Sequence, residues 1–278
     1  MSKLNIGIVG LGFVGSAVAH GFQYNNLFLV DPNLGTDTSI LKTQKMDAVF
    51  ICVSTPMAID GSVDASIVAK VLSELKDVNT LLVLKSTVPP NLVAGFAEQY
   101  ENFVYNPEFL TERNALWDFE NPISNVYGGK LEYTKQLEQI YKNHSICIEA
   151  NTFHMTATEA SFVKYTMNSF LSTKVLFFNQ LYDMVQSAGC DFEIIREAVS
   201  NDPRIGSSHT NVPGNDGRKG YGSACFAKDV PAFVRYSMKI GNEFTVLKEV
   251  WNSNCDYRNS YGSLLPREAE QHVVFNKM

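Results

Sequence analysis

The stretch GIVGLGFVG, residues 7–15, decides the fold of this chain. It places Gly10, Gly12 and Gly15 in the spacing G-x-G-x-x-G, after an alternating apolar run that predicts a strand and at the start of a helical pattern. Glycines at these positions allow a tight turn and let a pyrophosphate approach the helix N-terminus, where free N–H groups and the helix dipole favour anions. The stretch therefore predicts the first turn of a dinucleotide-binding βαβ unit.

An acidic residue at the end of the next apolar run supports this interpretation. Asp31 ends the run LFLVD, 21 residues after Gly10 (31 − 10 = 21), where a carboxylate can hold both ribose hydroxyls of an adenosine. The residues that follow, PNLGTDT, contain no arginine to receive a 2′-phosphate. The sequence therefore predicts NAD rather than NADP as the cofactor.

The first half of the chain alternates short apolar runs with helix-capable segments. Runs as apolar as these are typical of strands buried on both faces of a parallel sheet. The expected strands are LNIGIVG, LFLVD, DAVFICVS, TLLVLKS, NFVYN, SNVYGG and SICIEA. The alternation predicts an α/β fold, with a Rossmann-like, doubly wound parallel sheet as the NAD-binding domain over residues 1–152.

From residue 153 onward the pattern becomes helical. Between Met155 and Ala188 there is no proline or glycine, and apolar residues recur at helical spacing, which predicts one long central helix. Two further helices are expected at FEIIREAVS and VPAFVRYSMKIGNEFTVLKEVWNSN, with a long loop over residues 201–229 between them. Residues 153–278 are thus predicted to form a helical domain that binds substrate and mediates dimerisation.

The composition excludes several classes of protein. The chain has 278 residues, of which 45% are hydrophobic, and a net charge of −6, which gives no general attraction for nucleic acid or anionic membranes. No apolar run is long enough for a membrane span, and the N-terminus is not typical of a signal peptide. The five cysteines are scattered without a Cys-x-x-Cys pair, so we expect a reducing, cytoplasmic setting and no metal site.

The stretch GYGSACFAKD, residues 220–229, leaves two interpretations open on its own. Small residues before Cys225 allow a ligand or backbone to come close, and Lys228 lies near enough in sequence to favour a thiolate. Free cysteines, however, most often behave as small buried hydrophobic residues. The stretch by itself favours this structural alternative.

Six motifs in order resemble the UDP-glucose/GDP-mannose dehydrogenase family. The first two are GLGFVG and CVSTPMAIDGSVD. The other four are similar to the active-site segments of the family, and they are KSTVPP, NPEFLTE, VKYTMNSFLSTKVLFFNQL and GYGSACFAKDV. Members of that family use two NAD to oxidise the C6 alcohol of a nucleotide sugar to a carboxylate. The sequence departs from the family pattern at Ser223 and Ala227, where a glycine and a proline are usual. The resemblance also implies a further α/β domain that this sequence does not contain, so we expect a short form of the enzyme.

The resemblance assigns cofactor and substrate contacts to named positions. It implies cofactor-binding roles for Gly10, Gly12, Phe13, Val14, Gly15, Asp31, Thr55, Pro56, Ser86 and Lys228. It implies substrate-binding roles for Glu108, Phe109, Leu110, Arg204, Arg218, Tyr221 and Gly222. For Arg218 a solvent-exposed arginine is the alternative, and carboxylates four residues apart, such as Glu108 and Glu112, usually mark only a solvated helix face.

The catalytic roles also follow from the resemblance. Cys225 is implied as the nucleophile that forms a thiohemiacetal and then a thioester. Lys164 and Asn168, spaced i, i+4 on the long helix, are implied to stabilise the oxyanion. Their alternatives are a lysine that extends along the surface to solvent and an ordinary polar neighbour.

Three further residues complete the expected catalytic set. Asp229 is implied as the acid that works with a water as general base, although it is also placed to cap the following helix. Glu112 and Thr87 are implied to position the hydrolytic water.

Other functions remain open on the sequence alone. The expected function is that of an NAD-dependent UDP-glucose or GDP-mannose 6-dehydrogenase serving polysaccharide biosynthesis, active as a homodimer through the long helix. A β-hydroxyacid-type dehydrogenase shares a glycine turn and a helical lysine but transfers one hydride and needs no cysteine. An inactive remnant that binds only NAD or a partner is the non-enzymatic alternative.

Overall fold

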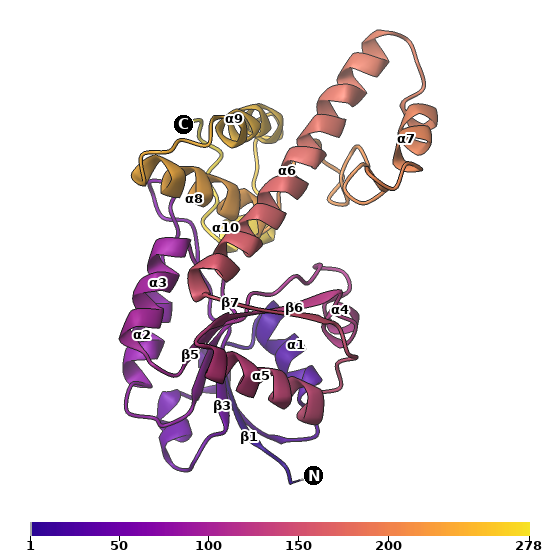
Figure 1. Cartoon of the computed structure of the whole chain (residues 1–278). Helices are drawn as coiled ribbons and strands as arrows, with labels where there is room; N and C mark the ends of the chain where they lie inside the picture. The colour runs from indigo at the N-terminus through magenta and orange to yellow at the C-terminus, as the bar shows by residue number, and fades with distance from the viewer. Residues whose placement is uncertain (1) are drawn as a thin grey trace. The chain divides into compact units, whose positions relative to one another are not determined.

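The computed structural model describes residues 2–278 of the chain (Figure 1). A seven-stranded sheet has the order β2-β1-β3-β4-β5-β6-β7 and is parallel except where β5 meets β6. Its strands are β1 (Asn5–Val9), β2 (Asn26–Val30), β3 (Ala48–Ile51), β4 (Leu81–Leu84), β5 (Phe103–Tyr105), β6 (Ser124–Gly129) and β7 (Asn151–Met155). The strand order reverses between β1 and β3, which is where ligands bind in open α/β sheets.

Helices cover both faces of this sheet (Figure 1). One face carries α2 (Ser66–Glu74) and α3 (Pro90–Gln99), and the other carries α1 (Phe13–Gly21), α4 (Ala115–Glu120) and α5 (Leu131–His144). All residues of β3 and β4 are buried, which explains their continuous apolar sequence. The core includes a group of packed rings from Phe22, Phe50, Phe119 and Tyr141. The predicted Rossmann-like fold class is confirmed.

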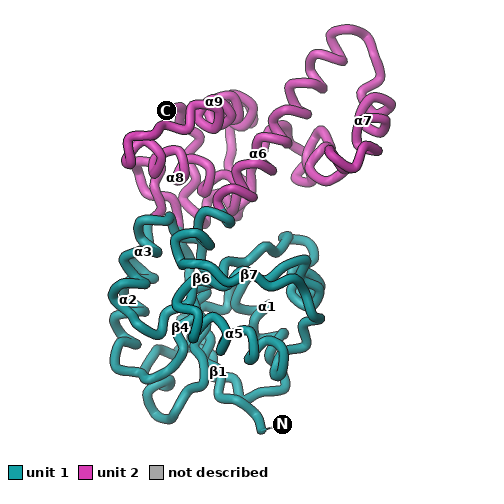
Figure 2. The backbone as a smooth tube through the Cα atoms, in the orientation of Figure 1, with its two compact units in different colours: residues 1–55, 64–164 teal, residues 56–63, 165–278 magenta. Residues whose placement is uncertain are grey.

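The chain divides into two compact units, coloured separately in Figure 2. Unit 1 comprises the residues up to Thr55 and Asp64–Lys164, and unit 2 comprises Pro56–Val63 and Tyr165–Met278. The division falls within helix α6 (Ala157–Ser187), the long helix predicted from the sequence.

Unit 2 is built around the longer part of α6. Its other helices are α7 (Phe192–Ser200), α8 (Phe226–Lys239), α9 (Thr245–Asn259) and α10 (Pro266–Glu270). Phe178 and Val185 of α6 pack with Phe192 of α7 in a small apolar cluster. Pro56–Val63, which follows β3 in the chain, also belongs to this unit. The amide of Met57 donates to the carbonyl of Gln271 at 2.9 Å, and the amide of Val274 donates to the Met57 sulfur at 3.4 Å.

Two predicted elements were wrong in detail. The run SICIEA is not a strand, because the amides of Ile146 and Ile148 donate to carbonyls at the ends of α1 and α4, and the last strand begins only at Asn151. The stretch from Val230 to Asn254 is not one helix. Gly241 adopts φ 75°, and the amide of Asn242 donates to the carbonyl of Ser237, so a Schellman turn ends α8 before α9 begins.

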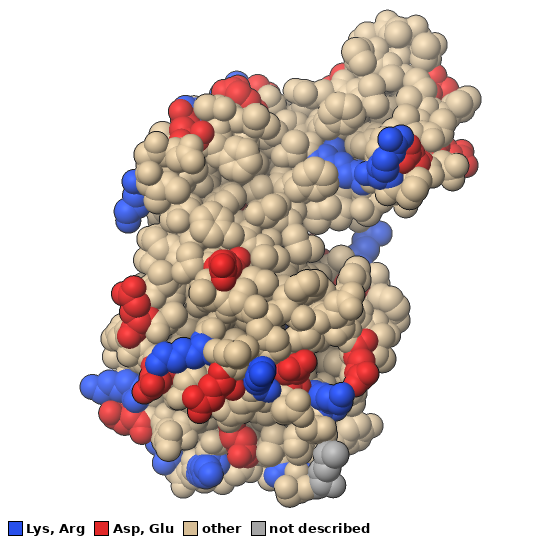
Figure 3. Space-filling view, viewed as in Figure 1, with Lys and Arg blue, Asp and Glu red and all other residues tan. Residues whose placement is uncertain are grey.

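The surface of unit 1 carries charges of both signs. Figure 3 shows basic and acidic side chains interspersed over it in this view, with no field of a single sign. Among residues 2–278 there is no cluster of three or more side chains suited to hold a metal ion. Within the same range, no helix combines the length and apolar character that crossing a bilayer requires.

Candidate active site

The glycine turn of unit 1 has the geometry that a dinucleotide requires. Gly10 adopts φ 88°, in the left-handed region that favours glycine. A Cβ at Gly15 would overlap the carbonyl oxygen of Gly10, so only glycine lets the helix start so close to the strand. At Gly12, by contrast, a Cβ would meet nothing within 4 Å. The turn is therefore packed on the protein side and open on the side where a pyrophosphate would lie.

Asp31 lies beside this turn at the end of β2. Its side chain accepts hydrogen bonds from the amide of Leu11 at 2.7 Å and from the amide of Asn33 at 2.9 Å. The residue is buried, yet each carboxylate oxygen keeps further acceptor capacity for ribose hydroxyls. These features of the glycine turn and Asp31 fit an NAD cofactor.

The loops after β3 and β4 hold further predicted residues. Thr55, Ser86 and Thr87 are buried, and the hydroxyl of Ser86 donates to the carbonyl of Val53 at 2.6 Å. Because β1, β3 and β4 are parallel neighbours, their carboxyl ends meet at the same edge of the sheet. Phe13 and Val14 are half-buried in the first turn of α1, and Pro56 is half-buried at the start of the segment assigned to unit 2.

A buried ion pair joins α6 to the loop after β5 within unit 1. The ammonium of Lys164 donates to Oε1 of Glu108 at 2.9 Å and to the Glu108 carbonyl at 2.6 Å, and it lies 5.4 Å from the ring centroid of Phe109. Both charged side chains are more than nine-tenths buried. The alternative of a lysine extending along the surface is therefore wrong for Lys164.

The same loop fixes the carboxylate of Glu108 from its other side. The amide of Leu110 donates to Oε2 of Glu108 at 2.7 Å. Burial by itself raises the pKa of Glu108, but the Lys164 ammonium and these hydrogen bonds outweigh it and lower the pKa below its ordinary value. Glu112 is exposed, and neither carboxylate lies on a helix, so the pair does not mark a solvated helix face.

A second buried cluster lies in unit 2, where α6 meets the start of α8. The amide of Asn168 donates to Oδ2 of Asp229 at 2.7 Å, and the ammonium of Lys228 lies 2.6 Å from the other oxygen of that carboxylate. All three residues are buried. Asp229 sits within the first turn of α8 and does not cap it, since the N-cap residue is Cys225.

Cys225 is half-buried at the beginning of α8. The long loop therefore ends at residue 225 rather than 229, and Lys228 and Asp229 belong to the helix. Tyr221 and Gly222, just before it, are buried. A Cβ at Gly222 would overlap Arg258 and Glu268, so the smallness of this residue serves packing against α9 and α10.

The two predicted arginines lie elsewhere in unit 2. Arg204 is exposed and pairs with Asp202 at 2.6 Å. Arg218 donates to the carbonyl of Ser263 at 2.6 Å and lies over the ring of Tyr261. Arg218 is half-buried, and its role in phosphate binding stays a prediction.

Sequence reasoning missed a buried lysine near the Glu108 pair. Lys85 donates to Oδ1 of Asn106 at 2.9 Å, and the Tyr141 hydroxyl donates to the same oxygen at 2.9 Å. Burial lowers the pKa of Lys85 to about 8. The signal available was a lysine directly after the apolar run of β4, a position that parallel sheets normally bury.

Comparisons with known proteins agree with this geometry. Residues 28–145 match the model described as "UDP-glucose/GDP-mannose dehydrogenase family, NAD binding domain", and residues 158–256 match its "central domain". The UDP-glucose 6-dehydrogenase of Rickettsia bellii is 32% identical over 220 residues, which cover 75% of this chain and 49% of that protein.

Solved structures share the fold. A UDP-glucose dehydrogenase from the hyperthermophilic archaeon Pyrobaculum islandicum has a TM-score of 0.77 at 29% identity, covering 93% of this chain and 69% of that one. The 3-hydroxyisobutyrate dehydrogenase of Mycobacterium tuberculosis has a TM-score of 0.73 at 14% identity, covering 97% of this chain and 98% of that one, which is a likeness of fold alone.

The matches to curated UDP-glucose 6-dehydrogenases cover most of this chain but only part of each relative. The chain spans about half the length of the curated UDP-glucose 6-dehydrogenases that it matches. The match to the NAD-binding domain confirms the cofactor expected from Asp31. Because two models of one family match in order over most of the sequence, the chain belongs to the UDP-glucose/GDP-mannose dehydrogenase family.

Proposed function

We propose that this chain carries the catalytic groups of an NAD-dependent nucleotide-sugar 6-dehydrogenase, with UDP-glucose as the first candidate substrate and GDP-mannose as the second. One observation carries the proposal: Lys164 and Asn168 lie one turn apart on α6, and each is hydrogen-bonded to a buried carboxylate. Burying ions is costly, and perturbed, paired ions in the interior favour a functional site over a structural one.

The first oxidation removes a hydride from the C6 alcohol and yields an aldehyde. Gly10, Gly12, Gly15 and Asp31 would hold NAD, which would serve as the hydride acceptor. Asp229, acting through a water, takes the hydroxyl proton as general base, and the Lys164 ammonium stabilises the developing alkoxide together with the amide of Asn168.

The second oxidation uses Cys225 as nucleophile. Its thiolate forms a C–S bond to the aldehyde carbon, the oxyanion again faces Lys164 and Asn168, and loss of a second hydride leaves a thioester. Water then breaks the C–S bond, giving the carboxylate and the free thiol. Glu112 and Thr87 position this water. Each acid formed would require two NAD as hydride acceptors.

Substrate contacts are proposed for residues of several loops. Glu108 with the backbone of Phe109 and Leu110 would contact the sugar, as would Tyr221 and Gly222. Arg204 and Arg218 are proposed to meet phosphate oxygens, because guanidinium groups bind phosphate in a bidentate way. Lys228 would serve the cofactor, and its present partner Asp229 would then be released for proton transfer.

Replacing the nucleophile tests this scheme. Cys225→Ser is expected to abolish acid formation while NAD binding and the melting temperature stay unchanged, because a serine hydroxyl is far less activated at neutral pH. Cys190→Ser, at an exposed cysteine, is the control and should keep full activity. Acid formation by Cys225→Ser at the wild-type rate would contradict the scheme.

The ratio of products separates the alternatives. The proposed reaction releases two NADH for each sugar oxidised, and a β-hydroxyacid-type reaction releases one. An inactive NAD-binding remnant releases no NADH.

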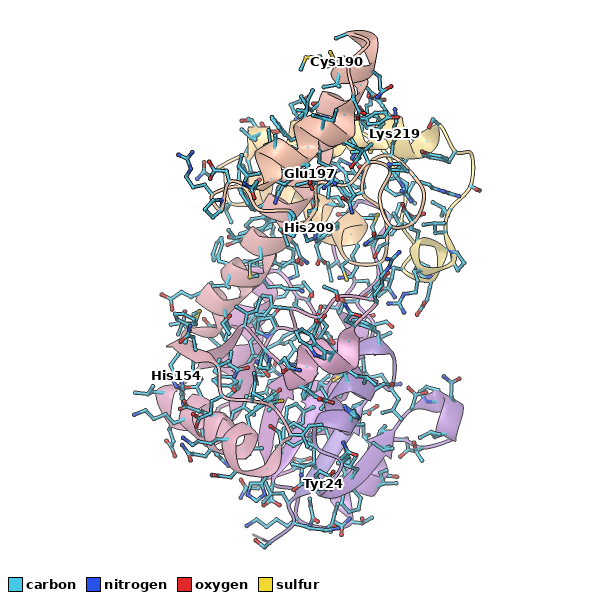
Figure 4. All side chains as sticks on the ribbon, turned by 90° about the vertical axis from the view of Figure 1, so that its right-hand side faces the viewer. Tyr24, His154, Cys190, Glu197, His209 and Lys219 are labelled. Carbon is cyan, nitrogen blue, oxygen red and sulfur yellow. The ribbon has the colours of Figure 1, made fainter. Side chains whose placement is uncertain are left out.

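We further propose that the active form is a homodimer paired through α6. Phe170, Phe177 and Met184 recur every seven residues on this helix and are 68%, 61% and 64% exposed. A stripe of large apolar side chains at heptad spacing is typical of a helix that packs against another helix. In Figure 4, Cys190 marks the tip of the α6–α7 hairpin, beyond the end of this stripe.

A further inference from the structure

The backbone that leads into Cys225 is held by buried side chains from three helices of unit 2. Asn179 of α6 accepts a hydrogen bond from the amide of Gly220 at 2.9 Å. Asn254 of α9 bonds to Tyr221 twice, accepting from its amide at 2.7 Å and donating to its carbonyl at 2.9 Å. Both asparagines are fully buried. The loop therefore has its polar groups bound by protein rather than by water.

Glu268 of α10 contacts the loop two residues before the cysteine. Its Oε1 accepts from the amide of Ser223 at 3.3 Å and lies 2.5 Å from Nη2 of Arg258, while Oε2 accepts from the amide of Leu265 at 2.8 Å. The residue has no exposed surface. One buried carboxylate thus links α9 and α10 to the loop, two residues before Cys225.

Arg258 holds that carboxylate in place. Its other terminal nitrogen, Nη1, lies 2.7 Å from the carboxylate of Asp216, and the guanidinium lies 5.7 Å from the ring of Phe275. Its side chain is fully buried. Removing one member of such a buried pair leaves the other charge uncompensated, so the arrangement of the loop depends on the pair remaining intact.

The backbone conformation of Ser223 indicates what the contact with Glu268 does. It adopts φ 69°, in the left-handed region that a residue with a Cβ rarely occupies. Such a conformation persists only when the surrounding structure fixes it. The hydrogen bond from the Ser223 amide to Glu268 supplies such a constraint at this residue.

We propose that Glu268 is a positioning residue for the Cys225 thiol: through the Ser223 amide it holds the loop in the strained conformation that places the thiol at the start of α8. The inference rests on the proposed role of Cys225 as nucleophile. Glu268 lies beyond the residues 158–256 that match the central domain.

A matched set of variants in the full chain tests the inference. Glu268→Gln keeps the size but offers one acceptor oxygen in place of two, so the amides of Ser223 and Leu265 and the guanidinium of Arg258 can no longer all be bound. Glu270→Gln is the control, because it makes the same change on the same helix at an exposed pair with Arg267. Ser223→Gly, combined with Glu268→Gln, removes the strain that Glu268 is proposed to support.

Hydrogen exchange measures whether the loop is held. In Glu268→Gln the amides of residues 220–225 should exchange faster by about tenfold, roughly 1.4 kcal/mol. Glu270→Gln should match the wild type, and the double variant should recover to within about twofold. Unchanged exchange in Glu268→Gln would overturn the inference whatever the enzymatic activity.

Alkylation measures whether the thiol itself is positioned. Iodoacetamide labelling, resolved by mass spectrometry, gives the rate at Cys225 relative to Cys190, the exposed thiol at the hairpin tip (Figure 4). At each pH between about 6 and about 9, this ratio should be roughly tenfold lower in Glu268→Gln than in the wild type. In the double variant it should return to the wild-type value.

The two readouts separate the inference from the proposed function. A ratio that does not change in Glu268→Gln overturns the positioning role, even if the loop exchanges faster. If wild-type Cys225 reacts no faster than Cys190, the proposed nucleophile is wrong, and hydrogen exchange then decides alone whether Glu268 holds the loop.

Discussion

Replacing Lys85 with methionine should change how the stability of unit 1 depends on pH. Lys85 is 4% exposed and lies between Asn106 and the rings of Phe119 and Tyr141. Methionine fills a similar volume without a charge. Asn106 keeps a partner after the change, because the Tyr141 hydroxyl also donates to its side-chain oxygen.

The sign and size of the effect follow from the pKa of Lys85. Burial lowers the pKa from 10.5 to about 8, although Cys52 and Glu108 act in the opposite direction. Between these values the unfolded chain binds a proton that the folded chain does not, so the free energy of unfolding rises with pH. Relative to Lys85→Met, the wild type should gain on the order of 3 kcal/mol as pH rises from about 8 to about 10.5.

The assay can use a thiol of unit 1 as its reporter. Cys52 is buried beside Lys85, and burial raises its pKa to about 12, so in the folded chain it stays protected from alkylation across this range. Pulse labelling of Cys52 through a urea series gives the unfolding free energy at each pH. Lys70→Met, at a side chain that is 76% exposed, is the control and should run parallel to the wild type. Parallel curves for Lys85→Met and the wild type would refute the reasoning.

Three further outcomes are expected. The wild type should bind NAD more tightly than NADP by about 1–3 kcal/mol, because Asp31 repels a 2′-phosphate and loses its ribose partner, and equal affinities by calorimetry would contradict this. Gly15→Ala should lower the melting temperature and abolish NAD binding, since its Cβ would overlap the Gly10 carbonyl; Gly95→Ala, where a Cβ meets nothing within 4 Å, should do neither. Phe170→Asp combined with Phe177→Asp should halve the mass seen by light scattering, whereas Ile148→Asp, at an exposed residue of unit 1, should not; a wild-type chain that is already monomeric would end the dimer proposal.

The elements that the sequence predicted are those set by local patterns. The glycine turn, Asp31 at the end of β2 and the uninterrupted helix α6 are each determined by residues close together in the chain, and all three are confirmed. SICIEA failed for the opposite reason. Its backbone is instead bound to the ends of α1 and α4 through the amides of Ile146 and Ile148, and periodicity alone cannot distinguish that environment from a place in the sheet.

The candidate site required contacts between distant residues. Lys164 and Glu108 are 56 residues apart, and Asn168 and Asp229 are 61 apart. The sequence indicated these positions only through the family resemblance, and nothing in it paired them. Glu268 carried no signal at all, because a glutamate on a short helix after a proline is usually an exposed, capping residue.

The contact between Met57 and the segment around Val274 has a consequence for how unit 2 is made. Their hydrogen bond spans 217 positions in the sequence. During synthesis the segment Pro56–Val63 emerges early and then waits for its partner while most of the chain is still to be translated. Since non-local contacts bring no gain until a long loop has closed, unit 2 should complete its structure late, and ribosome-bound chains ending before residue 270 should leave Met57 open to oxidation.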